Sequence, residues 1–426
     1  MTPSECFQIR TRPRPFVGRW YGSAFAMVLI MVNALVLFAP RVQAREAFSV
    51  FVDGLWPQAQ QMGVSRATFD TAFRGLKPDY SLPDLVLGNR KKPAKVRQAE
   101  FVRPPSGYLN AKTLGRLAAT GQKLARKHAG VLKRIEDEIG VGRYAVLAIW
   151  GRETSYGRYK LPHDAITVLA TQAYVGRRKK LFRNELLHAL KMLQEGVPRK
   201  KMRASWAGAV GMTQFMPTEY FKHAQGLDGG RADLFDSVAD ALASAARQLK
   251  NKGWVSGKTW GYEIVIPKSS SCALEGPPGM RPISEWMALG YRRVAGRKFA
   301  NHTLQDNAYL MSPAGAYGPS FLVLENFKVL RRYNTSDLYA TFVGNLADRI
   351  SGGGDFVTKW GGQGKQRTEI IRGVQQSLKD KGYPIGKVDG FIGSGTRRQV
   401  GQYQEKNKIK VDCWPTPGVL AHMRRN

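Results

Sequence analysis

The stretch Ala148-Ile-Trp-Gly-Arg-Glu153-Thr-Ser-Tyr-Gly-Arg-Tyr159 places one carboxylate near the end of an apolar segment. Upstream, apolar or small residues recur at helical spacing, at Tyr144, Leu147, Ala148 and Gly151, which predicts a buried helix. Gly157 is a natural stop just beyond that helix. Glu153 would therefore lie in the last turn, where the negative end of the helix dipole disfavours the ionised carboxylate.

A carboxyl group that stays protonated near neutral pH can serve as a general acid, for example toward a glycosidic oxygen. Partial burial of Glu153 against Trp150 or Tyr156 would favour the protonated form further. Arg152 and Arg158 would oppose this effect if their side chains lie close. The alternative is that Glu153 is a surface residue paired with a neighbouring arginine, an arrangement that is common and weak.

A second segment, Ser205-Trp-Ala-Gly-Ala-Val-Gly-Met-Thr-Gln214-Phe-Met-Pro217, is rich in small residues. Gly208 and Gly211 would let the backbone approach a ligand closely. Gln214 offers two donors and an acceptor, and Ser205 a rotatable hydroxyl, which suit sugar hydroxyls and amides. By composition alone, a tight packing corner between helices explains the segment equally well.

Together the two segments resemble the active site of the MltB-like family of lytic murein transglycosylases. The resemblance covers roughly residues 48–350 and includes Phe101-Val-Arg-Pro104 with Tyr108, Leu169-Ala-Thr-Gln-Ala-Tyr174, Gly253-Trp254, Trp260-Gly-Tyr-Glu263 and Arg332-Tyr-Asn-Thr-Ser-Asp-Leu-Tyr339. It implies a mainly α (α+β) fold, with a lysozyme-like catalytic domain, an inserted small α/β part and a substrate groove between them. The sequence itself favours helices at 180–193 and 239–250, and short strands or loops from 260 to 282.

The resemblance also implies a reaction, cleavage of the β-1,4 bond between N-acetylmuramic acid and N-acetylglucosamine in peptidoglycan. Glu153 would first protonate the glycosidic oxygen. It would then accept the proton of the muramic C6 hydroxyl, which closes a 1,6-anhydro ring without consuming water. The 2-acetamido oxygen would stabilise the cationic intermediate, whereas most glycosidases use a second carboxylate.

By the same resemblance, Ser205 and Gln214 would bind the saccharide beside the cleavage point, with Gln214 also orienting Glu153. The opposite side of the groove would be lined by Tyr333, Asn334 and Tyr339, with Asn334 placed for the acetamido group. The alternative for the two tyrosines is that they simply close the core. Asp164, in Pro162-His-Asp-Ala, is better explained as the N-cap of the following helix than as a second carboxylate.

One stretch departs from the family pattern. Many members carry an acidic, EF-hand-like loop after the second segment, but here Gly226–Asp233 is shorter and less acidic. Calcium prefers six to eight oxygen ligands, and Asp228, Asp233 and Asp236 are a small set. We therefore expect no bound metal and no cofactor, since the sequence has no His or Cys cluster for a transition metal either.

The N-terminus carries an export pattern. Arginines at positions 10, 12, 14 and 19 precede an apolar run over residues 23–39, and Val42-Gln-Ala44 is a small-residue cleavage site. We expect residues 1–44 to be a signal peptide. A retained N-terminal anchor is the alternative, because a run of about 17 residues is the shortest that spans a bilayer. Either places the protein in the periplasm, where it could also associate with the membrane.

The remaining chain divides into a catalytic domain (45–350), a glycine-rich linker (351–365) expected to be flexible, and a C-terminal domain (366–426). Helical patterns at 370–379 and 396–407 flank a Val-Asp-Gly turn, and the whole resembles the three-helix peptidoglycan-binding domain. Tethering such a domain would raise the local substrate concentration. Cys272 and Cys413 fall in different predicted domains, so we do not expect a structural disulfide between them.

The formal net charge of +34 would attract polyanions. In an exported protein these are the peptidoglycan glycan strands with their peptide carboxylates, and the anionic envelope surface; the export pattern argues against nucleic acid. The alternative for each basic cluster, such as Arg177-Arg-Lys-Lys180, is a solvated surface. Two rival functions stay open: a muramidase that hydrolyses the same bond, and an inactive wall-binding protein, which the intact Glu153, Ser205 and Gln214 argue against.

Overall fold

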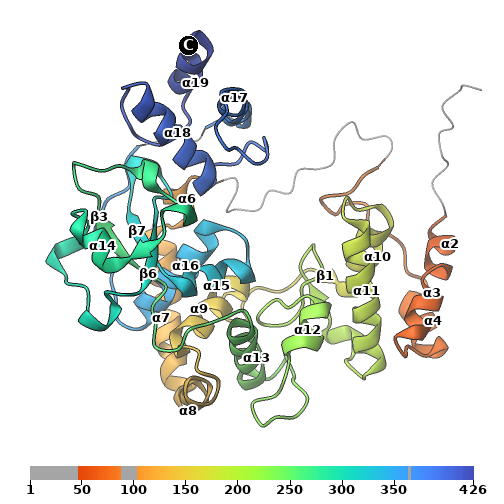
Figure 1. Cartoon of the computed structure of the whole chain (residues 1–426). Coiled ribbons are helices and arrows are strands. Elements are labelled where there is room, and N and C mark those ends of the chain that lie inside the picture. The colour runs from red at the N-terminus through yellow and green to blue at the C-terminus, as the bar shows by residue number, and fades with distance from the viewer. Residues whose placement is uncertain (1–46, 88–102, 363–365) are drawn as a thin grey trace, which may run out of the picture. The chain divides into compact units, whose positions relative to one another are not determined.

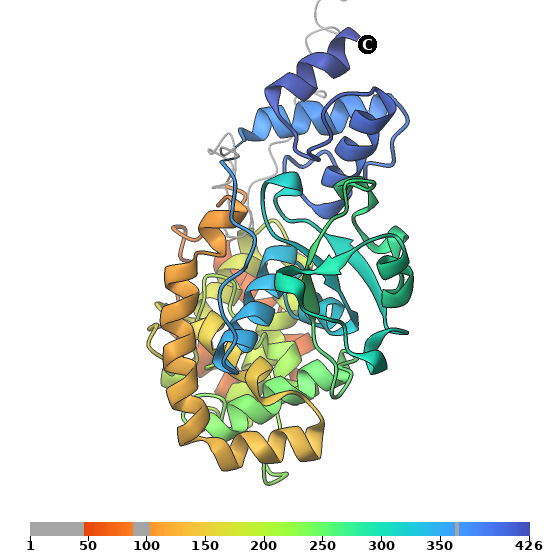
Figure 2. The same ribbon diagram turned by 90° about the vertical axis from the view of Figure 1, so that its left-hand side faces the viewer.

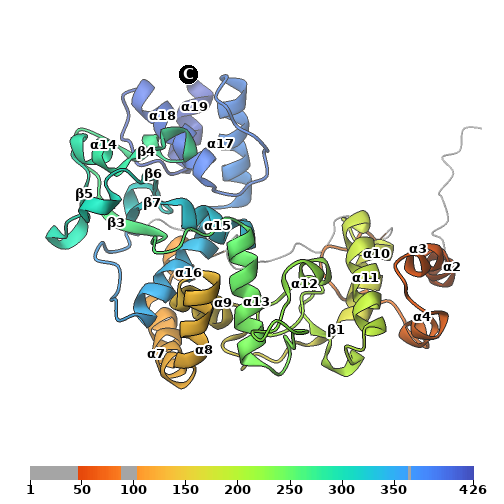
Figure 3. The same cartoon turned by 60° about the horizontal axis from the view of Figure 1, so that its bottom comes forward.

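Helix α9 (Arg143–Thr154) runs through a large hydrophobic core and is buried from Ala145 to Gly151. In this computed structural model the described residues are 47–87, 103–362 and 366–426, of which residues 51–426 belong to one unit of structure. Helix α9 packs against α7 (Ala111–Lys127), α13 (Val238–Asn251) and α16 (Asp337–Ile350) (Figures 1 and 3). The predicted buried helix that ends at Glu153 is confirmed.

Further helices complete the part of the chain that precedes the sheet. They are α2 (Phe48–Asp53), α3 (Trp56–Gln61), α4 (Arg66–Phe73), α6 (Pro105–Tyr108), α8 (Ala129–Arg134), α10 (Ala165–Val175), α11 (Lys179–Gln194) and α12 (Pro217–His223). A two-stranded ladder joins β1 (His163–Asp164) to β2 (Arg203–Ala204). The helices predicted at 180–193 and 239–250 correspond to α11 and α13, each one residue longer at both ends.

A five-stranded antiparallel sheet follows, within what we call the sheet region (residues 261–323). Its strand order is β4-β6-β7-β3-β5, formed by β3 (Gly261–Val265), β4 (Arg281–Pro282), β5 (Arg292–Arg293), β6 (Asn307–Met311) and β7 (Ser320–Val323). Alternate residues of a strand face opposite sides. In β6, Leu310 packs with α14 (Ile283–Ala288) in a small core, whereas Tyr309 and Met311 join the core that contains α9. The sheet is therefore buried on both faces.

Helices α15 (Glu325–Tyr333) and α16 return the chain to the core around α9. The C-terminal helical domain then follows, with α17 (Thr368–Asp380), α18 (Ser394–Lys406) and α19 (Pro417–Arg425) around their own apolar cluster. A mainly helical body with a small sheet and a three-helix C-terminal domain is the predicted architecture, and it is confirmed.

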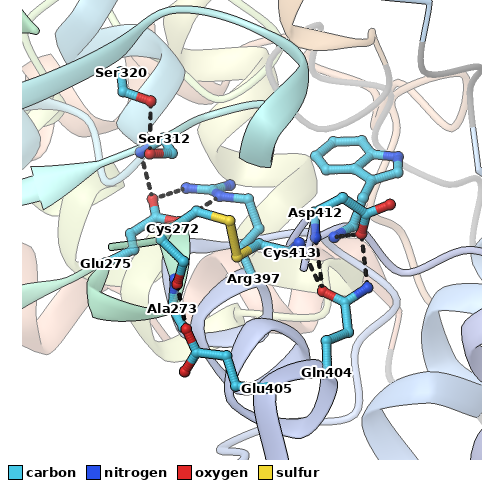
Figure 4. The surroundings of a disulfide bond; sticks show 12 residues. Cys272, Ala273, Glu275, Ser312, Ser320, Arg397, Gln404, Glu405, Asp412 and Cys413 are labelled. Carbon is cyan, nitrogen blue, oxygen red and sulfur yellow. Dashed lines mark hydrogen bonds and ion pairs between the residues drawn. A yellow bond between two sulfur atoms is a disulfide. The ribbon is translucent and has the colours of Figure 1, made fainter. Parts of the chain in front are cut away.

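A disulfide joins Cys272 of the sheet region to Cys413 of the C-terminal helical domain (Figure 4). Our expectation that these cysteines would not pair was wrong. The two cysteines are 141 residues apart in the sequence. They lie in different domains, but two domains that dock can still bring their cysteines together. Gly401 of α18 shows how close the docking is, since a Cβ there would lie 2.5 Å from Cys413 Sγ and 3.0 Å from Ala273 Cα.

Part of the predicted linker, within the described residues 351–362, contacts the sheet region. Glu263 of β3 accepts hydrogen bonds from the backbone of Val357 (2.9 Å) and Thr358 (2.7 Å). Phe356 packs edge-on against Phe321 at 5.3 Å. Residues 356–361 (the blue coil leading to the grey break in Figure 2) are thus held against the sheet region, because aromatic residues interrupt the glycines.

Candidate active site

Glu153 lies in the last turn of α9 and is half-buried. Its Oε1 accepts a short hydrogen bond from the hydroxyl of Tyr339, a residue of α16. The expected aromatic neighbours, Trp150 and Tyr156, pack instead on each other, with ring centroids 5.5 Å apart and the Tyr156 hydroxyl donating to the Leu117 carbonyl (3.0 Å). Tertiary contacts with α16 therefore supply the aromatic environment of Glu153.

The chain turns sharply after Thr154. Three consecutive residues, Ser155, Tyr156 and Gly157, have φ values of 51°, 60° and 79°. Left-handed backbone at Ser155 and Tyr156 is unfavourable in isolation, so packing must hold it. Gly151 makes room for the Tyr156 ring, since a Cβ at this position would lie 2.6 Å from that ring. The helix thus ends three residues before Gly157, the stop that the sequence indicated.

Thr154 connects the end of α9 to the glycine-rich segment. Its hydroxyl donates to the carbonyl of Met212 (2.7 Å) and accepts from the backbone N–H of Gly157 (3.1 Å). Thr154 is buried, so both hydrogen bonds are shielded from water. The Thr154 side chain thus ties the end of α9, next to Glu153, to the Ser205–Pro217 segment, which lies about fifty residues further along the chain.

The glycines of the second segment serve packing. A Cβ on Gly208 (φ +86°) would lie 2.3 Å from the Leu169 side chain in α10, and one on Gly211 (φ +73°) 2.9 Å from the Leu234 carbonyl. Of the two explanations that composition left open, the structure supports the packing corner at these positions. Within that corner Ser205 is half-buried and accepts from the backbone of Ala209 at 3.3 Å.

Gln214 is half-buried and adopts a left-handed conformation, with φ 56°. Its amide donates to the Gly211 carbonyl at 3.0 Å, whereas we expected it to orient Glu153. A strained backbone angle on a non-glycine residue is a common feature of functional sites. Ser205 and Gln214 thus lie in two successive turns of the segment that Thr154, the neighbour of Glu153, contacts through Met212.

Tyr333 and Tyr339 stand with nearly parallel rings, 6.4 Å between centroids and 7° between planes. Tyr333 donates to the Thr213 carbonyl at 2.5 Å, which ties α15 to the glycine-rich segment. Burial, together with the negative charge of Glu153, raises the pKa of both phenols well above its ordinary value, so both remain hydrogen-bond donors.

Tyr339 is only 1% exposed, so its ring closes the core, as the alternative reading of the sequence held. It contacts Glu153 through its hydroxyl and offers no ring face to a ligand in the groove. Asn334, half-buried at the end of α15, accepts from the backbone N–H of Ser336 (3.2 Å). Tyr333 and Asn334 thus stay candidate groove residues, whereas Tyr339 is buried and contacts Glu153.

Arg152 lies over the ring of Tyr339. Its guanidinium donates to the Tyr108 hydroxyl at 3.0 and 2.8 Å, and lies 5.2, 5.3 and 5.8 Å from the ring centroids of Tyr108, Phe342 and Tyr339. Burial opposes its charge, but the Tyr108 hydroxyl and Glu153 outweigh it and raise the pKa of Arg152. The sequence left open whether Arg152 lies close to Glu153; the structure holds its guanidinium in this aromatic cage, where the charge of Glu153 acts on it.

Two other carboxylates near the site are bound in structural roles. Asp164 caps α10 by accepting from the Thr167 N–H (2.8 Å), as its sequence context predicted. It also pairs with Arg199 (3.1 Å). Although burial opposes it, these contacts lower the pKa of Asp164. Glu219 pairs with Lys252 (2.8 Å) and His223 (3.4 Å), and the hydrogen bond from His223 above all lowers its pKa.

Lys201 binds the acidic residues of the shortened loop that follows the glycine-rich segment. Lys201 forms ion pairs with Asp233 (3.4 Å) and Asp236, so an ammonium group lies between two of the three candidate calcium ligands. Asp228 accepts from the N–H of Gly230 at 3.0 Å. Within residues 47–87, 103–362 and 366–426, no group of three or more His, Cys, Asp or Glu side chains is placed to hold a metal ion.

Comparisons with known proteins agree with this arrangement. Residues 47–348 match the family described as transglycosylase SLT domain, and residues 367–423 match the putative peptidoglycan binding domain. The chain is similar to membrane-bound lytic murein transglycosylase B of Escherichia coli K12, with 30% identity over 263 residues, 59% of this chain and 70% of that protein.

Two solved structures from Pseudomonas aeruginosa are also similar. The crystal structure of SltB3 in complex with NAG-NAM-pentapeptide superposes with a TM-score of 0.79 and 37% identity, covering 89% of this chain and 100% of that one. The soluble lytic transglycosylase SltB1 superposes with a TM-score of 0.57 and 25% identity, covering 70% and 97%. The similarity to SltB3 therefore extends over most of the chain.

Proposed function

The chain belongs to the transglycosylase SLT family and is a lytic transglycosylase of peptidoglycan, and we propose that Glu153 is its single general acid and base. The observation that carries this proposal is the hydrogen bond from Tyr339, which fixes one carboxylate oxygen of Glu153 at the end of a buried helix. Nearby Asp164 and Glu219 are held in ion pairs, which supports a mechanism with one carboxyl group.

In the proposed reaction the Glu153 carboxyl donates its proton to the oxygen between muramic acid and glucosamine. The bond from C1 to that oxygen breaks, and the 2-acetamido oxygen of muramic acid stabilises C1. The C6 hydroxyl then forms a bond to C1 and gives its proton to Glu153, which restores the acid. No water is consumed, so the product ends in 1,6-anhydromuramic acid.

The saccharide would contact Ser205, Gln214, Tyr333 and Asn334. All four are half-buried. The segment with Ser205 and Gln214 accepts hydrogen bonds from Thr154, the neighbour of Glu153, and from Tyr333. Tyr339 would keep Glu153 in one rotamer through both proton transfers, which lowers the entropic cost of reaching the transition state.

The C-terminal helical domain would hold the enzyme on peptidoglycan, as its family match supports. The excess of positive charge would strengthen this attachment through the carboxylates of the wall. Part of that charge is neutralised within the protein, since Arg177 and Arg178 both pair with the buried Asp84, at 2.8 and 3.3 Å.

We also propose that the protein acts in the periplasm. The predicted signal peptide (residues 1–44) lies outside the described residues, and among the residues that the structure describes no helix is long and apolar enough to cross a membrane. The disulfide supports an oxidising compartment. Intact-mass measurement of the protein from its host would test this: a mature chain starting at Arg45 supports cleavage, and an N-terminus within the first few residues supports an anchor.

The decisive test is mass spectrometry of muropeptides released from purified sacculi. Wild-type protein should release anhydromuropeptides, and Glu153→Gln should release none. Glu195→Gln is the matched control, because Glu195 is an exposed residue just beyond α11. Products heavier by one water would instead identify a muramidase, and no release by the wild type would identify a wall-binding protein.

A further inference from the structure

The C-terminal helical domain is docked onto the sheet region by more than the disulfide. Asp412 accepts from the Tyr317 hydroxyl (2.7 Å), and its carbonyl accepts from the Ala316 N–H (3.0 Å). Ser271 donates to Glu405 of α18 at 2.5 Å. Figure 4 shows two of these residues, Glu405 and Asp412, together with the Cys272–Cys413 bond. The domain is therefore fixed in one position, which a simple tether to the wall does not require.

An ion pair lies at the centre of this junction. Arg397 of α18 binds Glu275 through two parallel contacts, 2.9 and 2.6 Å, and the side chains are 3% and 0% exposed. The Ser312 N–H also donates to Glu275 (3.0 Å). Buried charges of this kind are tolerated only when each is fully paired, so the geometry of the junction is tightly specified.

The same guanidinium also reaches the catalytic body. It lies 3.6 Å from Oδ2 of Asp337, whose Oδ1 pairs with Arg331 of α15 at 2.8 Å. Asp337 is the first residue of α16, and Tyr339, two residues later, donates to Glu153. A continuous set of contacts thus runs from the C-terminal helical domain to the proposed acid.

We propose that Arg397 is a positioning residue for the transglycosylase reaction. By holding Asp337, it fixes the first turn of α16 and so the Tyr339 hydroxyl that orients Glu153. Docking of the C-terminal helical domain then contributes to the turnover rate itself, in addition to binding the wall. This inference rests on the proposed role of Glu153.

A short soluble glycan, an alternating N-acetylglucosamine–N-acetylmuramic acid tetrasaccharide, separates the two roles. The full chain carrying Asp337→Asn keeps the Arg397–Glu275 pair and hence the docking, but weakens the link to α16. A second variant, Glu275→Gln with Arg397→Gln, replaces both buried charges by neutral amides. We expect kcat on the tetrasaccharide to fall about tenfold for each, with KM changed less than twofold. Arg424→Gln, an exposed arginine of α19, should leave both constants unchanged.

An unchanged kcat on the tetrasaccharide for Asp337→Asn would overturn the proposal, whether or not activity on sacculi falls. Circular dichroism would show whether the double variant folds. If it does not, the result for Asp337→Asn alone decides the proposal. Failure of the proposed function is distinct, because the wild type would then release no anhydro product from the tetrasaccharide.

Discussion

Glu153 and Glu275 are two acids of the same chain with opposite surroundings. Glu153 is half-buried, and one of its carboxylate oxygens accepts a hydrogen bond from the Tyr339 phenol. Glu275 is fully buried and bound by both arms of a guanidinium. The phenol holds one oxygen of Glu153, whereas the guanidinium holds both oxygens of Glu275. With the proposed role of Glu153, one fold uses a carboxylate for chemistry in one place and for rigidity in another.

The largest expected effect is a loss of stability on breaking the ion pair of Glu275. Glu275→Gln leaves the Arg397 charge buried with its main partner neutral, which should destabilise the protein by about 4 kcal/mol. Denaturant unfolding of the oxidised protein measures this. Glu153→Gln is the counterpart and should change the free energy of unfolding by less than about 1 kcal/mol, although it abolishes activity. Equal stability losses in the two variants would contradict the division of roles.

A third acid, Asp348, sharpens the comparison because it is half-buried and accepts its hydrogen bond from a neutral indole. Burial raises its pKa to about 6, although the hydrogen bond from the Trp260 indole (2.8 Å) opposes the shift. A carboxyl with a raised pKa binds its proton more tightly in the folded state. Its contribution to stability is thus complete below about pH 4 and is lost as the pH rises through 6, by up to about 3 kcal/mol.

Asp348→Asn should remove this pH dependence. The amide can still accept from Trp260, so the variant should match the wild type at pH 4 and exceed it in stability by about 2–3 kcal/mol at pH 8. Unfolding curves at both pH values test this. Identical differences between variant and wild type at pH 4 and pH 8 would show that Asp348 does not titrate as its burial indicates.

The smallest expected effect concerns the donor to Glu153. Tyr339→Phe keeps the buried ring and removes one hydrogen bond to the carboxylate, so kcat should fall about tenfold, which corresponds to about 1.4 kcal/mol. Steady-state kinetics on the soluble tetrasaccharide provide the measurement. Tyr403→Phe is the control, because its hydroxyl bonds His422 in the C-terminal helical domain. A kcat equal to the wild type in Tyr339→Phe would leave Glu153 oriented by other contacts.

The sequence by itself determined the local features of this protein. The spacing of apolar residues predicted α11 and α13 to within one residue at each end and placed Glu153 in the last turn of α9, and Asp164 was identified as a helix cap. Glu153 could be identified because a lone carboxylate at the end of an apolar helix is a local pattern, contained within about a dozen consecutive residues. Its combination with the glycine-rich segment indicated the family, and the fold followed from that resemblance.

Only the tertiary structure decided how distant segments meet. The sequence placed Tyr339 among the groove residues, but its burial against Glu153 depends on how α16 packs beside α9. The sequence alone allowed the glycines at 208 and 211 to make room either for a ligand or for a packed side chain. In the structure they make room for Leu169 and Leu234. Cys272 and Cys413, 141 residues apart, carry no local signal of pairing. Such contacts depend on the docking of whole elements, since no short-range pattern encodes which buried surfaces will face each other.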